Sequence, residues 1–195
     1  KFTFLVPKGV ASKRLTKYGK VISVIGLSKF DNSQLGYYKN LRWILILREI
    51  FFLIPTLYAI FCIKKKIKKI DTIHFNEITL IPTIILFNFF FSVPFILHCR
   101  ILFKRDNFFG NKISNFLKNS IFQIIAIDND VKNSLPKMLN VKIVRNIFIK
   151  TKIKKKNIIK NDKYLKIEYI GSFLKYKGIE DLIYAVDSLV KNKYK

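Results

Sequence analysis

The chain has 195 residues, half of them hydrophobic, and a formal net charge of +25 at pH 7. This length suits one ordinary domain or a domain and part of another, and the apolar content excludes an intrinsically disordered protein. Lysine supplies nearly all of the positive charge, and arginine, which nucleic-acid binders use for bidentate contacts, is scarce. The charge therefore indicates a coding bias toward A/T-rich codons, and we expect no nucleic-acid partner.

Short β-branched or aromatic runs alternate with longer amphipathic patterns along the chain, which predicts βα units and a parallel sheet. Runs such as FTFLV and IFQIIAI are almost wholly apolar, as buried parallel strands are. The expected strands are residues 2–6, 20–25, 72–75, 94–98, 122–127, 141–145 and 165–170. The expected helices are residues 8–18, 41–69, 79–91, 110–119, 128–139 and 178–190.

The two cysteines, Cys62 and Cys99, stand alone in apolar settings and form no C-x-x-C pair. A zinc site or redox motif is therefore not expected, and both should be free thiols in a reducing compartment. The chain begins at Lys1 inside an apolar run, without methionine or a signal-peptide pattern. We therefore expect it to be the middle of a longer protein.

Two apolar stretches could be mistaken for membrane-spanning helices. Residues 50–63 are uncharged but shorter than the roughly 18 to 20 residues that a span needs. Residues 78–99 are long enough, but the sequence SVP inside them is typical of a turn between a buried helix and a buried strand. Basic residues flank both stretches on both sides, so no orientation bias is present. The alternative function is that of a small basic membrane protein, in which the two hydrophobic segments 41–63 and 78–99 form a hairpin.

The sequence DTIHFNE places Asp71, His74 and Glu77 three residues apart. On a helix the three side chains could share one face and hold a metal ion, but on a strand odd spacing alternates faces. Because the segment is predicted to be a strand that runs into a loop, we expect no metal site. Asn76 and Glu77 should lie just beyond the carboxyl end of a parallel strand, where ligands bind in open α/β sheets.

The next strand ends in PFILHCR, which places His98 and Arg100 at the corresponding position. A neutral histidine there can act as a general base, and an arginine can hold a phosphate or carboxylate. A partly buried histidine and a surface arginine explain the pattern equally well. Asp128 or Asn129, just ahead of the following helical pattern, is a plain N-cap.

The strongest charge run, residues 148–163, is typical of a solvated linker between two domains. Beyond it, YIGSFLKYKGIEDLIYAV reads as a strand, a glycine exit at Gly171, a basic loop, and a helix that begins near Gly178. Free backbone N–H groups at that helix start, with Lys175 and Lys177 beside them, favour a bound phosphate. A solvated strand-to-helix connection is the competing interpretation.

This stretch resembles the start of the second domain in glycosyltransferase family 4, in which a strand ending in glycine precedes a short loop, Lys-Gly and a helix. The matching positions are Gly171, Lys177, Gly178, Leu182 and Ala185. Three other stretches match in the correct order: IDTIHFNE, PFILHCR and IIAIDNDVKNSL with the following VKIVRN. The resemblance covers most of residues 65–190.

The resemblance implies a GT-B architecture, with two Rossmann-like domains facing across a cleft. Such enzymes transfer a sugar from a nucleotide-diphosphate donor to an acceptor with retention of configuration, without a metal ion or another cofactor. The resemblance also implies that Lys177 contacts the diphosphate of the donor. The other residues of this site are Gly171, Ser172, Lys175 and Gly178. Stabilising the leaving diphosphate is electrostatic work that suits a lysine and a helix N-terminus. Asn76 and Glu77 fall on the acceptor side of the cleft.

The chain departs from the family pattern at several positions. Ser172 stands where many members have a second, arginine contact to the diphosphate. Arg100 stands where many members carry a histidine, so the catalytic base is not assigned and His98 and Arg100 are only weak candidates. Asp128 replaces a common serine, and Ile147 replaces a common proline.

The resemblance also places the family's first strand and glycine-rich acceptor loop before Lys1, and its acidic E-x7-E motif after Lys195. We therefore expect residues 1–147 to be an acceptor-side domain without its first strand, 148–163 a linker, and 164–195 the start of the nucleotide-sugar-binding domain. The fragment alone should be inactive.

The complete protein should be a hexosyltransferase-like enzyme that acts on a glycan or lipid-linked acceptor in surface polysaccharide or glycoconjugate synthesis. We expect a cytoplasmic protein that is peripheral on the inner face of the cell membrane, because a basic domain can dock on an anionic leaflet.

Overall fold

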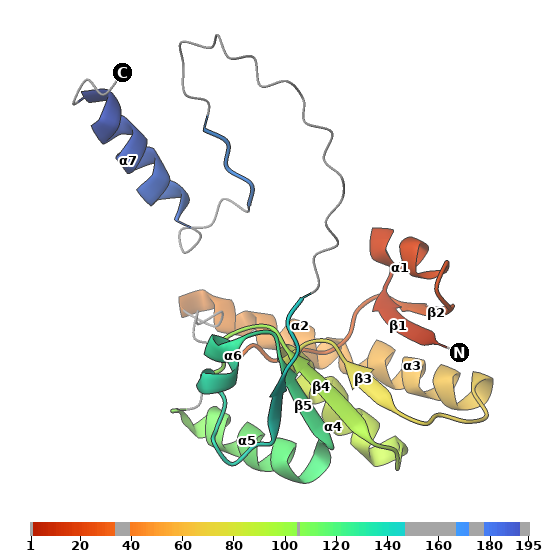
Figure 1. Ribbon diagram of the computed structural model, residues 1–195. Coiled ribbons are helices and arrows are strands. Elements are labelled where there is room, and N and C mark those ends of the chain that lie inside the picture. Colours follow the sequence, from red (N-terminus) through yellow and green to blue (C-terminus); the bar gives the residue numbers. More distant parts are fainter. Residues whose placement is uncertain (1, 34–39, 105, 147–166, 172–177, 192–195) are drawn as a thin grey trace. The chain divides into compact units, whose positions relative to one another are not determined.

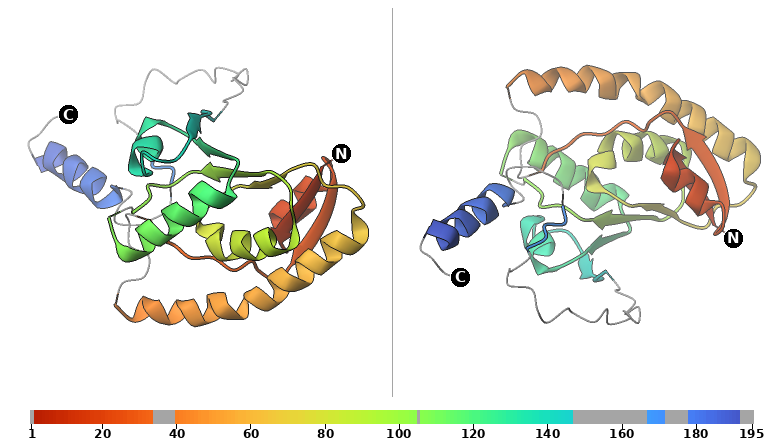
Figure 2. Two further views of the ribbon diagram at one scale, coloured as in Figure 1. Left: turned by 90° about the horizontal axis from the view of Figure 1, so that it is seen from below. Right: turned by 90° about the horizontal axis from the view of Figure 1, so that it is seen from above.

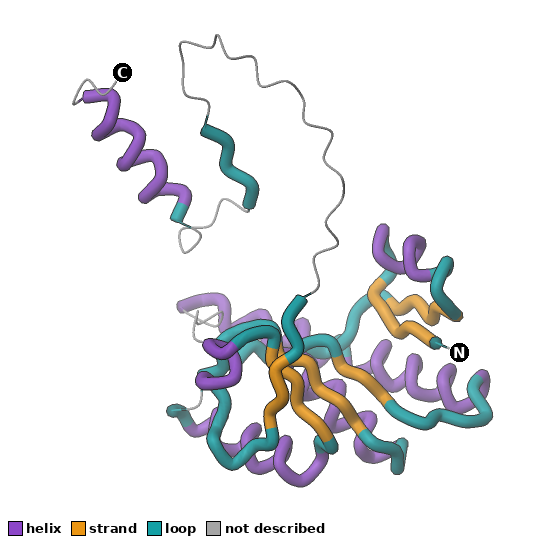
Figure 3. The backbone as a smooth tube through the Cα atoms, viewed as in Figure 1, coloured by secondary structure: helices purple, strands orange, loops and turns teal. Residues whose placement is uncertain are grey.

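The computed structural model describes residues 2–33, 40–104, 106–146, 167–171 and 178–191 of the chain. The chain divides into two compact units, Lys1–Phe148 and Ile149–Lys195. Strands and helices alternate along the first unit, and the described part of the second unit contains one helix (Figure 3). The predicted linker begins at this division, but all of it lies outside the described residues. The identity of the two units as transferase domains stays a prediction.

The described residues of the first unit form six strands and their connecting helices, close to the predicted positions. In chain order these are β1 (Thr3–Pro7), α1 (Val10–Leu15), β2 (Lys20–Val24), the 3₁₀ helix η1 (Asn40–Ile44), α2 (Leu45–Phe51), α3 (Leu53–Lys66), β3 (Ile73–Phe75), the 3₁₀ helix η2 (Ile78–Leu80), α4 (Ile81–Phe90), β4 (Phe95–Cys99), α5 (Phe108–Ser120), β5 (Gln123–Ala126), α6 (Asn129–Ser134) and β6 (Val141–Ile143).

Helix α6 is the element whose end was predicted least well, because it stops at Ser134 instead of continuing to residue 139. Leu135 already has an extended backbone, with φ −79° and ψ 152°. Pro136 follows it, and the residue before a proline is pushed out of the helical region.

All strand pairs are parallel, as predicted, but they form two sheets rather than one (Figure 1). Strands β3, β4, β5 and β6 lie side by side in chain order, and β1 and β2 form a separate two-stranded sheet. The fold class is therefore mixed α/β with parallel strands, compatible with Rossmann-like units. Among the described residues, no strand pairs with both β1 and β3.

One face of the four-stranded sheet forms the main core. Alternate residues of its strands, such as Leu97 and Ile124, are buried together with side chains of α4 and α5. The ring of Phe75 packs edge-on against Phe87 of α4 and Phe95 of β4, with centroids 5.5 and 5.4 Å away. Figure 2 shows α4 and α5 on the same side of the strands. The opposite face is only partly covered, and His74 on it is exposed.

The two apolar stretches have different structures. Residues 78–99 divide into η2, α4 and the buried strand β4, with the turn at SVP as predicted. Residues 50–63 belong to a longer helical run that comprises α2 and α3.

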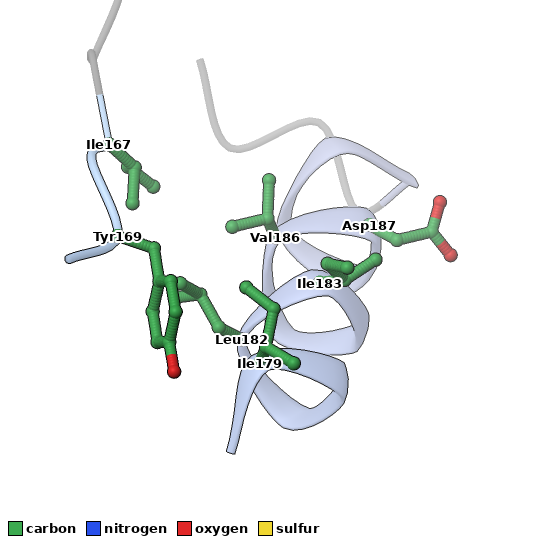
Figure 4. A pocket seen from close by; sticks show the side chains of 7 residues that line it. All are labelled: Ile167, Tyr169, Ile179, Leu182, Ile183, Val186 and Asp187. Atoms are coloured by element: carbon green, nitrogen blue, oxygen red, sulfur yellow. The ribbon is translucent and has the colours of Figure 1, made fainter. Parts of the chain in front are cut away.

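The second unit contains helix α7 (Ile179–Lys191), which has no buried residue. The strand predicted at residues 165–170 is wrong for the described part, because residues 167–170 have no strand partner there. Ile167 and Tyr169 instead lie beside the apolar face of α7 and form an open groove with it (Figure 4).

Candidate functional site

The candidate site lies at the carboxyl edge of the four-stranded sheet. Because the strands are parallel and adjacent, the residues that follow them share one edge, where α/β proteins bind ligands. Asn76 and Glu77 follow β3, Arg100 follows β4, and Asp128 follows β5. Asp128 is the predicted N-cap of α6, and its carboxylate accepts a hydrogen bond from the Val131 N–H at 2.8 Å.

Glu77 is the half-buried carboxyl group of this edge. Its Oε1 accepts a hydrogen bond from the Ile78 N–H at 3.0 Å, which caps η2. Burial raises the pKa of Glu77, and the charge of Asp31 adds to the increase, while the Ile78 hydrogen bond, Arg100 and Lys29 oppose it. Glu77 is therefore surrounded by charges of both signs, and burial has the largest effect.

The segment 27–33, which follows β2, carries two of these charges to Glu77 and is held by buried hydrogen bonds. Ser28 Oγ donates to the Glu49 carbonyl of α2 at 2.7 Å, and the Ser28 carbonyl accepts from Thr83 Oγ1 of α4 at 2.8 Å. The Lys29 N–H donates to the Glu49 carboxylate at 3.0 Å. Two helices thus fix the loop that positions Lys29 and Asp31.

The same segment is also joined to the residues after β4. The Asn32 amide donates to the Lys104 carbonyl at 2.7 Å, the Lys104 N–H donates back to the Asn32 carbonyl at 2.9 Å, and the Asn107 amide donates to Asn32 Oδ1 at 2.9 Å. The Phe103 N–H in turn donates to Ser134 Oγ of α6 at 2.9 Å. The segments that follow β2 and β4 and the end of α6 are therefore connected by hydrogen bonds.

Lys29 and Asp31 were not singled out from the sequence. A signal was present, because Gly26 follows an apolar strand and precedes polar residues, the pattern that drew attention to residues 169–178. At Gly26 a Cβ would lie 2.9 Å from the ring of Phe52, so the loop leaves β2 where only glycine fits without moving that ring. The pattern did not reveal that the loop crosses to the edge of a different sheet.

His98 lies on the partly covered face of the sheet, stacked on His74 of the neighbouring strand with ring centroids 6.0 Å apart. The two are diagonal neighbours, because His74 pairs in register with Ile96. Burial lowers the pKa of both histidines, and for His98 the charges of His74 and Arg100 add to the decrease. His98 is therefore neutral at pH 7. Its buried Nε2 has no hydrogen-bond partner among the described residues.

Cys99, on the core side of the same strand, is not a reactive thiol. Burial raises its pKa to about 12, and the charge of Glu77 contributes to the increase. A thiol with this pKa is protonated at neutral pH and is neither a nucleophile nor a metal ligand.

Together, these groups offer a half-buried carboxyl, a guanidinium and a neutral imidazole, with a lysine beside them. Such a set can accept hydrogen bonds from hydroxyl groups and hold a negatively charged group, as the acceptor side of a cleft requires. The described residues contain no group of three or more His, Cys, Asp or Glu side chains arranged to hold a metal ion. Asp71 precedes β3 by two residues, with 81% of its side-chain surface exposed, and its carboxylate is 3.4 Å from Lys69 Nζ.

Only part of the predicted diphosphate site can be placed. Ser172, Lys175 and Lys177 lie outside the described residues, whereas Gly171 and Gly178 lie within them. Gly178 precedes α7 with φ +72°, a left-handed backbone that favours glycine, and its carbonyl accepts the Leu182 N–H at 3.0 Å.

The structure therefore defines this chain as an α/β protein with a polar site at the carboxyl edge of a parallel sheet. No protein-family model, curated protein or solved structure matches the chain.

Proposed function

We propose that this chain is part of a retaining GT-B glycosyltransferase of family 4, which transfers a sugar from a nucleotide-diphosphate donor to a glycan or lipid-linked acceptor. Residues 1–147 contribute the acceptor side, and residues 164–195 begin the donor side. The partner substrates are the nucleotide sugar and the acceptor, and the enzyme works at the inner face of the cell membrane.

One observation carries this proposal. The three stretches of the first unit that resemble the family fall on β3, β4 and β5, which are consecutive neighbours in one parallel sheet. Their polar residues Glu77, Arg100 and Asp128 follow the strands at a common edge. This arrangement is the one that a Rossmann-like domain requires, with polar residues gathered at the carboxyl edge of a parallel sheet.

The division into two sheets supports the same proposal. The resemblance implies a first strand that is normally central to the sheet and is expected before Lys1, and in the structure β1 and β3 belong to separate sheets. Leu5 of β1 packs against the cluster that includes Phe75 of β3, so both sheets share one core.

In the proposed mechanism, Lys177 and the N-terminus of α7 neutralise the diphosphate that leaves with the nucleotide. Glu77 and Asn76 bind the hydroxyl groups of the acceptor. The positive charge of Arg100 offsets the negative charge of the Glu77 carboxylate. Neutral His98 stays a weak candidate, because its Nε2 is buried and could meet the sugar or the acceptor only after the side chain moves.

The coding sequence around the chain provides the first test. We expect a reading frame that continues past Lys195 and encodes an E-x7-E motif. A stop codon directly after Lys195 would contradict an active enzyme.

The second test uses the protein with its native flanking sequence and measures release of nucleoside diphosphate from nucleotide sugars. Lys177→Ala is expected to lower kcat by about 10² to 10³, the range found when one electrostatic contact to the transition state is removed. Lys191→Ala is the matched control, because Lys191 ends α7 and its ammonium is 2.7 Å from the Asp187 carboxylate. Equal losses in the two variants would refute the role of Lys177.

A membrane protein is the second candidate function, favoured by one observation. Residues Leu45–Lys66 form a helical segment of 22 residues that is long and apolar enough to cross a membrane, with 28% of its most apolar window buried. Carbonate extraction tests this candidate, because an integral protein stays in the membrane pellet.

A further inference from the structure

The helical run formed by η1, α2 and α3 exposes apolar side chains along the face that points away from the core. Six of them form what we call the outer stripe, and each is at least 56% exposed: Trp43, Leu47, Ile50, Ile54, Tyr58 and Phe61. Their spacing of three or four residues places them on one side of a continuous helix. A contiguous apolar surface of this kind marks an interaction site, whereas scattered exposed residues do not.

The opposite face of the same run is already occupied. Thr56, Ala59 and Ile60 are completely buried, and α3 packs against β2 and α4. In both views of Figure 2 the α2–α3 rod runs along the edge of the first unit, with no other element of that unit on its outer side. The helix is therefore apolar on two sides. The fold of the described residues covers one of them and touches the other where the ring of Phe61 meets Phe90 of α4, with centroids 5.9 Å apart.

The charges around the outer stripe have one sign. Between residues 40 and 69 the only acidic residue is Glu49, which is buried and paired with Arg48. The last turn of α3 carries exposed Lys64, Lys65 and Lys66, and two further lysines follow. Because the chain carries a net charge of +25, a second copy seated on this surface would be repelled, whereas an anionic surface would be attracted.

We infer that the outer stripe is a membrane-docking surface, which lies in the interface of an anionic bilayer with the helix axis parallel to the membrane. From Trp43 to Phe61 the stripe is about 27 Å long at 1.5 Å per residue. Tryptophan and tyrosine favour the headgroup level of a bilayer, and lysines at one end meet the anionic lipid heads. The helix keeps its inner face in the core, so docking needs no change in the fold.

This inference does not depend on the transferase chemistry. It assigns a specific surface to the membrane contact that the net charge alone only suggested, and its experiment has no enzymatic readout. Failure of the membrane test would leave the proposed transfer reaction untouched, and failure of the transfer assay would leave the docking surface untouched.

The experiment uses the 195-residue chain, in which Trp43 is the only tryptophan and so reports on the stripe directly. The chain is mixed with vesicles of neutral phosphatidylcholine, or of phosphatidylcholine with about a third phosphatidylglycerol. We expect a blue shift of the Trp43 emission and cosedimentation with the anionic vesicles, and both should weaken as salt is raised. Equal binding to neutral and anionic vesicles, or no shift, would overturn the proposal.

Two matched triple variants locate the surface. Replacing Leu47, Ile54 and Phe61 by serine is expected to lower partitioning into anionic vesicles by at least about tenfold, because three apolar side chains no longer enter the interface. Replacing Phe122, Met138 and Val144 by serine is the control, since these exposed apolar residues lie next to β5 and β6. Circular dichroism verifies that each variant keeps its helix content. Equal losses in both variants would contradict the assignment.

The depth of Trp43 in the bilayer and the association state of the chain distinguish surface docking from the other ways in which the outer stripe could be covered. Brominated lipids should quench Trp43 most strongly when the bromines are near the headgroups. Strong quenching only by deep bromines, together with resistance to carbonate extraction, would show a spanning helix and refute surface docking. Sedimentation equilibrium without lipid should give a monomer. A dimer that already shields Trp43 would show that a second copy covers the stripe, and would equally refute the proposal.

Discussion

Helices α5 and α7 have the same length, 13 residues each, and both carry an apolar face, yet they are stabilised very differently. In α5 the apolar residues Ile113 and Leu117 are buried against the four-stranded sheet. In α7 no residue is buried, and its apolar residues line an open groove with Ile167 and Tyr169.

The comparison shows that an amphipathic pattern determines a helix and its apolar face, but not whether that face is buried against another element. Most of the stability of a helix in a protein comes from packing of that face. In helix α7, local interactions also contribute: Glu180 and Asp181 in its first turn lie at the positive end of the helix dipole, and Gly178 forms the turn before it.

The largest difference between the two helices should appear when their central leucines are shortened. Leu117→Ala removes a fully buried side chain and is expected to lower the free energy of unfolding by about 2 to 5 kcal/mol. Leu182→Ala, in α7, should change the unfolding of the first unit by less than about 0.5 kcal/mol. Urea unfolding followed by circular dichroism measures both, and comparable losses would show that α7 is packed as tightly as α5.

The starts of the two helices give the next largest effect. Asn107 caps α5 by accepting the Gly110 N–H at 2.6 Å and also donates to Asn32. Asn107→Ala should cost about 1 to 2 kcal/mol, the usual loss for a helix cap. Gly178→Ala forces a side chain into a left-handed conformation and should cost about 1 to 2 kcal/mol locally. Amide hydrogen exchange should then be faster in α7 and unchanged in α5. A faster rate in α5 as well would contradict a local effect of the Gly178 substitution.

An effect of similar size is expected for the hydrogen bonds that hold segment 27–33. Thr83→Val removes the hydroxyl that donates to the buried Ser28 carbonyl and leaves that acceptor unpaired. The expected loss is about 1 to 3 kcal/mol, at the lower end if water reaches the carbonyl. Thr79→Val is the matched control, because its carbonyl, and not its hydroxyl, binds the Phe30 N–H. Denaturant unfolding compares the two variants, and equal stability would show that the Thr83 bond contributes nothing.

The smallest effect is a pH dependence confined to the first unit. The pKa of His98 is lower in the folded chain than its ordinary value of 6.5, so the unfolded chain binds more protons between the two values. Stability contributed by His98 is therefore present above pH 6.5 and is lost as the pH falls through the lowered pKa. We expect His98→Gln to reduce the difference between the urea midpoints at pH 5 and pH 8. If the difference between the two urea midpoints is unchanged in His98→Gln, the pH dependence of stability arises from other groups.

Glu77 should act with the opposite sign. Its folded pKa is raised above 4.5, so its stabilising contribution is present below that pH and is lost as the pH rises through the raised value. Glu77→Gln should remove this loss, which urea midpoints between pH 4 and pH 7 can measure. A midpoint profile identical to that of the unaltered chain would show that burial of Glu77 is too slight to matter.

Much of the fold was predictable because its signals are local. Every strand of the first unit lies within two residues of its predicted bounds, since β-branched and aromatic runs between turn residues indicate strands reliably. The cap at Asp128 and the turn before β4 follow equally local rules. The position of Glu77 and Arg100 at one edge followed from parallel strands.

The parts of the site that were missed depend on contacts between residues far apart in the chain. Asn32 bonds to Lys104 across 72 positions, and Thr83 bonds to Ser28 across 55. No periodicity in either segment encodes that pairing. The stacking of His74 on His98 likewise required the register of two strands, which a single strand pattern does not contain.

By itself, then, the sequence determined which segments are strands and helices, that the strands run parallel, and which residues end at the carboxyl edge. Only the tertiary structure decided that the strands divide into two sheets, that segment 27–33 reaches Glu77, and that one apolar face of α2–α3 is buried while the other is exposed. The physical reason is one of range. Backbone propensity and side-chain periodicity act over a few residues, whereas burial depends on which distant surface arrives to cover a face.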